Sequence, residues 1–148
     1  MICSLSKSSY IQRIKVTHTV NKQLFGENTM ANSGLLGPYP LEEKYIVRFV
    51  TNSADWSSAS VFALGKITNK KFVIKKVCHA DGDLSMALKR YMGTYEAFRF
   101  RFYRSTRSAF NKQCQLYHQF NPSDNLEHPT RPINTRFTCP DPSCILSG

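Results

Sequence analysis

Cysteine and histidine side chains gather in the last third of the chain, at spacings that suit a metal ion. Cys114 and His118 are four residues apart in a segment with helical periodicity, so both project from one face of a helix. Cys139 and Cys144 follow in a proline-rich segment. Two ligands from a helix and two from a loop can complete the tetrahedral coordination of zinc. The sequence therefore predicts a structural zinc site formed by Cys114, His118, Cys139 and Cys144.

His128 is a further candidate ligand, and it could replace His118 or lie outside the site. Four protein ligands leave no position for a reactive water, so this zinc would hold the tail against the helix and would not hydrolyse a substrate. The alternative is that Cys114 is only a small buried side chain and that the two terminal cysteines are free thiols.

The segment from Lys89 to Lys112 is strongly basic, with seven Lys and Arg residues against one acid, Glu96. The formal net charge of the chain is +10, which favours an anionic partner, nucleic acid rather than a membrane. Contacts to phosphates of DNA or RNA would be salt-dependent and tolerant of sequence. The predicted contact residues are Lys89, Arg90, Arg99, Arg101, Arg104 and Arg107. The alternative is a solvated polar face that only aids solubility.

The elements that would position these residues form an α/β fold. Strands are predicted at 45–50, 61–67 and 71–77, with a turn at 68–70. Phe98, Phe100 and Phe102 alternate with arginines, which predicts a half-buried strand with a basic outer face. Helices are predicted from a cap at Asp81 or Asp83 to position 91, and from a cap at Ser105 or Thr106 to position 120. The simplest packing is an antiparallel sheet of three to four strands flanked by helices.

The domain organisation is predicted to be a flexible N-terminal extension and linker over residues 1–40, which includes a possible short strand at 11–16. A single domain over 41–148 would follow, with the Cys/His-rich tail at 121–148. Five cysteines without a secretion signal predict an intracellular protein, cytoplasmic or nuclear. No apolar run is long enough to span a bilayer, and the oligomeric state stays open.

Residues 58–144 contain an ordered set of short words that carries a family resemblance. These are SVFALG at 60–65, KVCHAD at 76–81 followed by DL at 83–84, ALKRY at 87–91, AFNKQCQLYH at 109–118, HP at 128–129 and CP at 139–140. In order and spacing they resemble the GIY-YIG nuclease superfamily, and more closely a subgroup of small proteins with a Cys/His-rich C-terminal tail. The resemblance implies a GIY-YIG-like α/β domain.

The same resemblance implies that the catalytic positions are degenerate. Active members are thought to use two strand tyrosines, arginine and a helix glutamate that binds a divalent metal. The matching positions here hold Phe62 and Lys76 for the tyrosines, His79 and Ala87 for arginines, and Asn111 or Gln113 for the glutamate. These side chains supply neither the phenol nor the carboxylate of that site, so no catalytic magnesium is expected.

The predicted function is accordingly a catalytically inactive, nuclease-like domain that binds nucleic acid through a basic surface. Two alternatives stay open: an active nuclease of altered mechanism that uses His79, Lys76 or Arg90, and a zinc-stabilised protein-interaction module.

Overall fold

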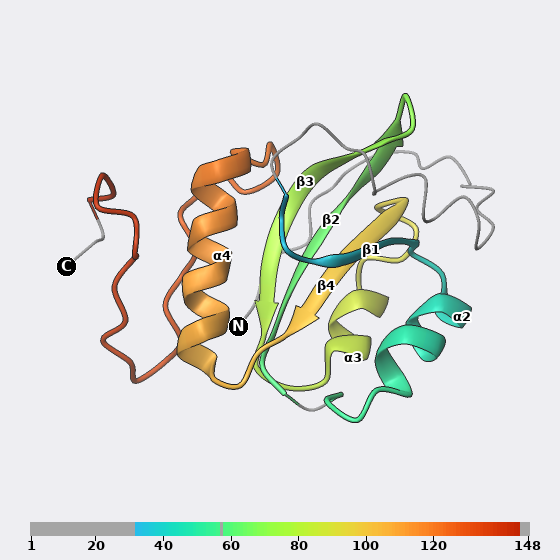
Figure 1. Ribbon diagram of the computed structural model, residues 1–148, viewed down its shortest axis with the longest axis horizontal. Coiled ribbons are helices and arrows are strands. Elements are labelled where there is room, and N and C mark those ends of the chain that lie inside the picture. Colours follow the sequence, from blue (N-terminus) through green and yellow to red (C-terminus); the bar gives the residue numbers. More distant parts are fainter. Residues whose placement is uncertain (1–31, 57, 146–148) are drawn as a thin grey trace.

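The computed structural model describes residues 32–56 and 58–145. Its centre is a four-stranded antiparallel sheet with the strand order β1-β4-β2-β3, and helices cover both faces (Figure 1). The strands are β1 (Leu36–Pro40), β2 (Ser60–Thr68), β3 (Lys71–Ala80) and β4 (Ala97–Phe102). The helices are α2 (Glu43–Ile46), which continues into the π-helical turn η1 (Val47–Thr51), α3 (Leu84–Lys89) and α4 (Thr106–Phe120). The predicted α/β class, with helices flanking a small antiparallel sheet, is confirmed.

The β2–β3 hairpin forms as predicted. Asn69 and Lys70 make the turn with φ angles of 51° and 63°, the left-handed conformation that a tight two-residue hairpin turn requires. β4 then pairs with the other side of β2, and β1 pairs with β4. The sheet is therefore held mainly by contacts between β2 and its two neighbours.

Helices pack on the two faces of the sheet and create two hydrophobic cores. On one face, α2, η1 and α3 cover Phe62, Leu64, Phe98 and Phe100, all at most 3% exposed. On the other face, α4 covers a second core that includes Val61, Ala63, Val77 and Leu116. Figure 1 shows the resulting three layers, with the C-terminal tail running along the outer side of α4.

Side-chain caps begin α3 and α4. Asp83 Oδ1 accepts hydrogen bonds from the backbone N–H of Ser85 at 2.9 Å and of Met86 at 3.2 Å. Ser105 Oγ accepts a hydrogen bond from the Ser108 N–H at 3.1 Å. Each cap satisfies an N–H that has no partner within the helix, so these two candidates among the predicted caps are the ones used.

The predicted strand at 45–50 is wrong, because these residues belong to α2 and η1. Their β-branched and aromatic side chains favour a strand locally. Ile46 and Val50 are nevertheless four residues apart and fully buried, while Tyr45 and Phe49 share a neighbouring flank and their rings stack. This helical spacing places the apolar groups against the sheet, and burial outweighs strand propensity.

The predicted linker is also wrong at its end, because residues 36–40 form β1 and pair with β4. The sheet thus begins before the predicted domain boundary at residue 41. The possible strand at 11–16 and most of the predicted extension lie outside the described residues.

The start of the tail lies along β3, the last strand of the sheet. The Asp124 N–H donates to the Lys75 carbonyl at 2.8 Å. The Asn125 side chain accepts from the Val77 N–H at 2.7 Å and donates to the Val77 carbonyl at 3.0 Å. In the described part of the chain, no helix has the length and hydropathy needed to cross a bilayer.

Candidate metal centre

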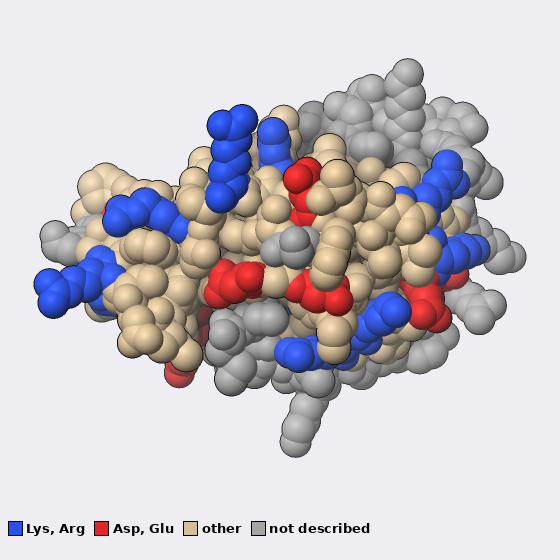
Figure 2. Space-filling model, turned by 90° about the horizontal axis from the view of Figure 1, so that it is seen from below, with Lys and Arg blue, Asp and Glu red and all other residues tan. Residues whose placement is uncertain are grey.

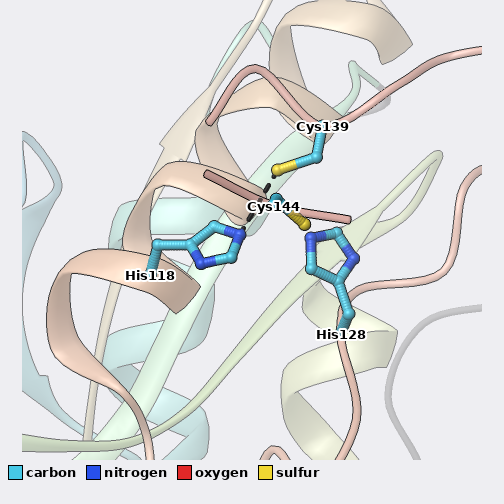
Figure 3. Close-up of side chains that lie close together, drawn as sticks. All are labelled: His118, His128, Cys139 and Cys144. Atoms are coloured by element: carbon cyan, nitrogen blue, oxygen red, sulfur yellow. Dashed lines mark hydrogen bonds between the residues drawn. The ribbon is translucent and has the colours of Figure 1, made fainter. Parts of the chain in front are cut away.

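Four side chains converge between α4 and the tail, namely His118, His128, Cys139 and Cys144 (Figure 3). One ligand atom from each lies within 4.8 Å of the others. His118 comes from the last turn of α4, and the other three come from the tail. Two imidazoles and two thiols form a donor set typical of structural zinc sites. The cluster can therefore hold a metal ion.

The two imidazoles are oriented by their second ring nitrogens. His128 Nδ1 lies 2.9 Å from the Pro129 carbonyl, to which it can only donate. His128 Nε2 is buried and has no hydrogen-bond partner among the described residues. His118 Nε2 lies 3.3 Å from Cys139 Sγ, and its Nδ1 faces Asp141 Oδ2 at 3.8 Å. A carbonyl or carboxylate behind a histidine is the usual arrangement in metal sites, so the geometry fits an ion.

Burial favours the protonation state that a metal requires of His128. Burial lowers the pKa of this imidazole, and the contact with the Pro129 carbonyl opposes the shift only in part. The neutral ring keeps a lone pair on Nε2, the atom that has no other partner.

Cys114 lies beside the cluster and outside the set of converging ligand atoms. Its side chain is fully buried between Phe110 and Cys139, and burial raises the pKa of its thiol. Three of the predicted ligands thus come together, and His128 takes the place that the sequence assigned to Cys114. Cys114 lies one helical turn before His118, so its side chain is displaced along α4 and packs in the small core beneath the tail.

Arg99, predicted to lie on a basic outer face, is instead only 8% exposed. Its guanidinium donates to the Leu35 carbonyl at 3.3 Å and lies 5.5 Å from the centre of the Phe72 ring. Burial lowers its pKa to about 10, with a smaller opposing effect from Tyr39. The prediction failed because the segment before β1 and the Phe72 ring cover this side chain, so Arg99 is a core residue.

The other predicted basic residues are exposed, but they lie on two sides of the sheet. Lys89 and Arg90 end α3, and Lys89 forms a 3.1 Å ion pair with Glu43. Arg101, Arg104 and Arg107 surround the start of α4 on the opposite side. On the face shown in Figure 2, acidic side chains lie between groups of basic ones. The predicted strip is therefore split.

The sequence resemblance pairs several positions with the catalytic residues of GIY-YIG nucleases. Apart from the half-buried Asn111, each of these positions is at most 3% exposed. They are Phe62, Lys76, His79, Ala87 and Gln113. Phe62 and Ala87 belong to the core beneath α3, and Lys76 lies opposite Leu64 on the same side.

His79 and Gln113 face each other on the α4 side of the sheet. His79 Nδ1 lies 2.5 Å from Gln113 Oε1, and Gln113 Nε2 donates to the Val77 carbonyl at 3.3 Å. The pair thus joins α4 to β3. Lys76 Nζ instead donates to the Asp124 carbonyl at 3.3 Å, and burial lowers its pKa. These polar groups are used for packing and do not converge on a shared pocket.

A groove of about 860 Å³ runs along the exposed side of α4 next to the metal cluster. One wall is α4 and the other is the tail segment 140–142. No pattern in the sequence indicates this groove, because its second wall depends on where the tail lies. No family model matches the chain, and neither a curated protein nor a solved structure shows significant similarity to it.

Proposed function

We propose that this chain is a nuclease-like domain without hydrolytic activity that binds nucleic acid through the basic surface around α4. Arg101, Arg104, Arg107 and Lys112 define this surface, which we call the α4 basic surface. The observation that carries the proposal is its uncompensated charge. Within the described residues, no ion pair involves any of these four side chains.

The charges of the α4 basic surface act against one another. Arg104 and Arg107 flank the N-terminal cap of α4, and no acid lies in its first turn. The N-terminal end of a helix carries partial positive charge and favours anions. Burial lowers the pKa of Lys112, and the nearby Arg101 lowers it further. A phosphate backbone would relieve this repulsion.

We propose the absence of hydrolysis because the positions that match the nuclease site lack the catalytic side chains and are mostly buried away from a substrate. A general base or a metal ligand must reach the scissile phosphate. Lys76 and His79 are at most 3% exposed and lie on opposite faces of the sheet, while Arg90 is exposed at the end of α3. These separations argue against the alternative of an altered nuclease site.

We also propose that the ion in the His118, His128, Cys139 and Cys144 cluster is zinc and that its role is structural. The donor set is soft, and four protein ligands complete a tetrahedron. The ion would tie the tail to α4, where the hydrophobic core has only Phe110, Cys114 and Cys139 as buried members.

Binding can be measured by fluorescence anisotropy with a labelled oligonucleotide at two salt concentrations. The Arg104→Gln/Lys112→Gln variant is expected to bind about tenfold more weakly and to lower the salt slope by about 2. Lys66→Gln/Lys71→Gln removes the same charge from the exposed hairpin and serves as the control. Equal losses in both variants, or no salt-sensitive binding by the wild type, would contradict the proposal.

Hydrolysis is tested separately with supercoiled plasmid and Mg²⁺ or Mn²⁺. The wild type is expected to leave the plasmid intact. Nicking that disappears in a His79→Ala variant would favour the altered nuclease over our proposal.

A further inference from the structure

The groove along α4 has one wall that is lined almost entirely by polar side chains. Ser108, Asn111, Lys112, Gln115, His118 and Gln119 line it from the helix. Pro140, Asp141 and Pro142 form the tail wall, and Tyr103 lies at the end nearest β4. An apolar protein segment would leave these helix groups without partners, so the lining favours a polar ligand.

Three amides form a row on this face of α4. Asn111, Gln115 and Gln119 are spaced by four residues, which aligns them along the helix. Among the described residues, no hydrogen bond involves the Asn111 or Gln119 side chain. Gln115 Oε1 accepts from Lys112 Nζ at 3.3 Å, and the Gln115 amide nitrogen has no hydrogen bond to any residue that the structure describes. An amide both donates and accepts, as the edge of a nucleobase does.

Tyr103 and Lys112 add the two other contacts that a nucleotide needs. The Tyr103 ring is half-buried against the core beneath α4, which holds it in place. A fixed aromatic ring is a stacking partner for any base. Lys112 lies on the same wall, and Arg101 is close enough to lower its pKa, so phosphates would run along this side. Asp141, on the other wall, would repel them.

We infer that this groove binds single-stranded nucleic acid, with unpaired bases on the amide row and on Tyr103. The inference rests on the proposed function and assigns its ligand class. In a duplex the Watson–Crick edges are paired and the bases are stacked on one another, so stacking on Tyr103 is excluded and the amides could reach base edges only through a groove.

The metal cluster would set the width of the groove. The tail wall lies between Cys139 and Cys144, and His118 both lines the helix wall and belongs to the cluster. An ion held by these ligands fixes the two walls relative to each other. Metal removal should therefore weaken single-strand binding more than duplex binding.

The test compares one labelled sequence as single-stranded DNA, single-stranded RNA and duplex DNA, with the zinc-loaded full chain. Either single strand is expected to bind at least about tenfold more tightly than the duplex. Tyr103→Leu and Gln115→Ala/Gln119→Ala should each remove most of this excess and leave duplex binding unchanged. Tyr103→Phe keeps the ring and should keep the preference. Tyr45→Leu and Asn52→Ala, on the opposite side of the sheet, are the matched controls.

The exposed Gln115→Ala/Gln119→Ala variant keeps the test decisive if Tyr103→Leu does not fold. Equal binding of single strand and duplex, or an unchanged preference in this variant, overturns the proposal that the groove binds single strands. If Arg104→Gln/Lys112→Gln then still weakens duplex binding, the proposed function stands without it. No binding of any oligonucleotide overturns both.

Discussion

The positions of individual nitrogen and sulfur atoms determine which side chains could hold an ion between α4 and the tail. His118 and His128 each present one ring nitrogen to the cluster and have the other against an oxygen, from Asp141 and Pro129 respectively. Cys114 has no comparable position, because its thiol is enclosed by the core beneath the tail. The structure therefore separates two cysteines that could hold a metal ion, Cys139 and Cys144, from a neighbouring one that packs in the core.

The first prediction compares these residues directly. Purified wild-type protein is expected to carry about one zinc ion per chain. His128→Ala and Cys139→Ser should lose it, because three remaining ligands leave the site open. Cys114→Ala should retain it. Metal content measured by mass spectrometry checks all four proteins, and zinc loss in Cys114→Ala with retention in His128→Ala would restore the ligand set predicted from the sequence.

Much of the cluster could be predicted from residue types, and its exact membership could not. Cys139, Cys144 and His118 stand out because soft ligands near prolines and on a helix are a known pattern. The choice between Cys114 and His128 depends on how the tail crosses α4. That path is set by contacts such as Phe110 with Phe137, whose rings stack at 6.1 Å, and these are distant in sequence.

Among the elements, β2 depends on a close approach of backbones at one glycine. The register of the β2–β3 pair shifts between Leu64 and Gly65. A Cβ atom at Gly65 would lie 2.0 Å from the Val73 carbonyl oxygen. No side chain fits there, so the packing of β2 against β3 alone requires glycine at position 65, the last residue of the SVFALG motif.

The second prediction is a strong loss of stability in Gly65→Ala. Backbone displacement is expected to cost at least about 3 kcal/mol, which lowers the Tm by about 6–12 °C in a domain of this size. Gly82→Ala is the control, because nothing lies within 4 Å of an added Cβ there. Thermal unfolding followed by circular dichroism compares the two. Similar Tm values for the variants would show that the hairpin tolerates the shift.

Elements with a clear period could be predicted, while those shaped by tertiary contacts could not. The hairpin, β4, α3 and α4 follow from alternation, caps and helical spacing. β1 contains Pro38 and Pro40, which argue against a strand in the middle of a sheet. They are tolerated because β1 lies at the edge and needs partners on one side only.

The whole molecule consists of three packed layers and a tail that lies outside them and contributes little to their cores. Its two large cores lie between helices and sheet, and tail residues belong only to the third and smallest. Leu126 and Ile133 are 90% and 81% exposed, so hydrophobic burial does little to fix the tail. Metal binding should therefore affect the position of the tail more than it affects the folding of the sheet.

The third prediction concerns removal of the metal. A strong chelator is expected to make residues 126–145 sensitive to limited proteolysis and to leave a resistant fragment that contains 32–120. Added zinc should restore protection in the wild type, and Cys139→Ser should be cleaved without chelator. Mass spectrometry of the fragments identifies the sites. Equal resistance with and without chelator would mean that packing alone holds the tail.

The contact of the tail with β3 has a consequence for how copies of the protein behave toward each other. An open strand edge offers unpaired N–H and carbonyl groups to any similar chain. At one edge, prolines in β1 limit such pairing, and at the other, Asp124 and Asn125 occupy groups of Lys75 and Val77. If loss of the ion extends the release of the tail to Asp124 and Asn125, the β3 edge is uncovered, and metal-depleted protein is then expected to self-associate and precipitate at concentrations where the loaded protein remains dispersed.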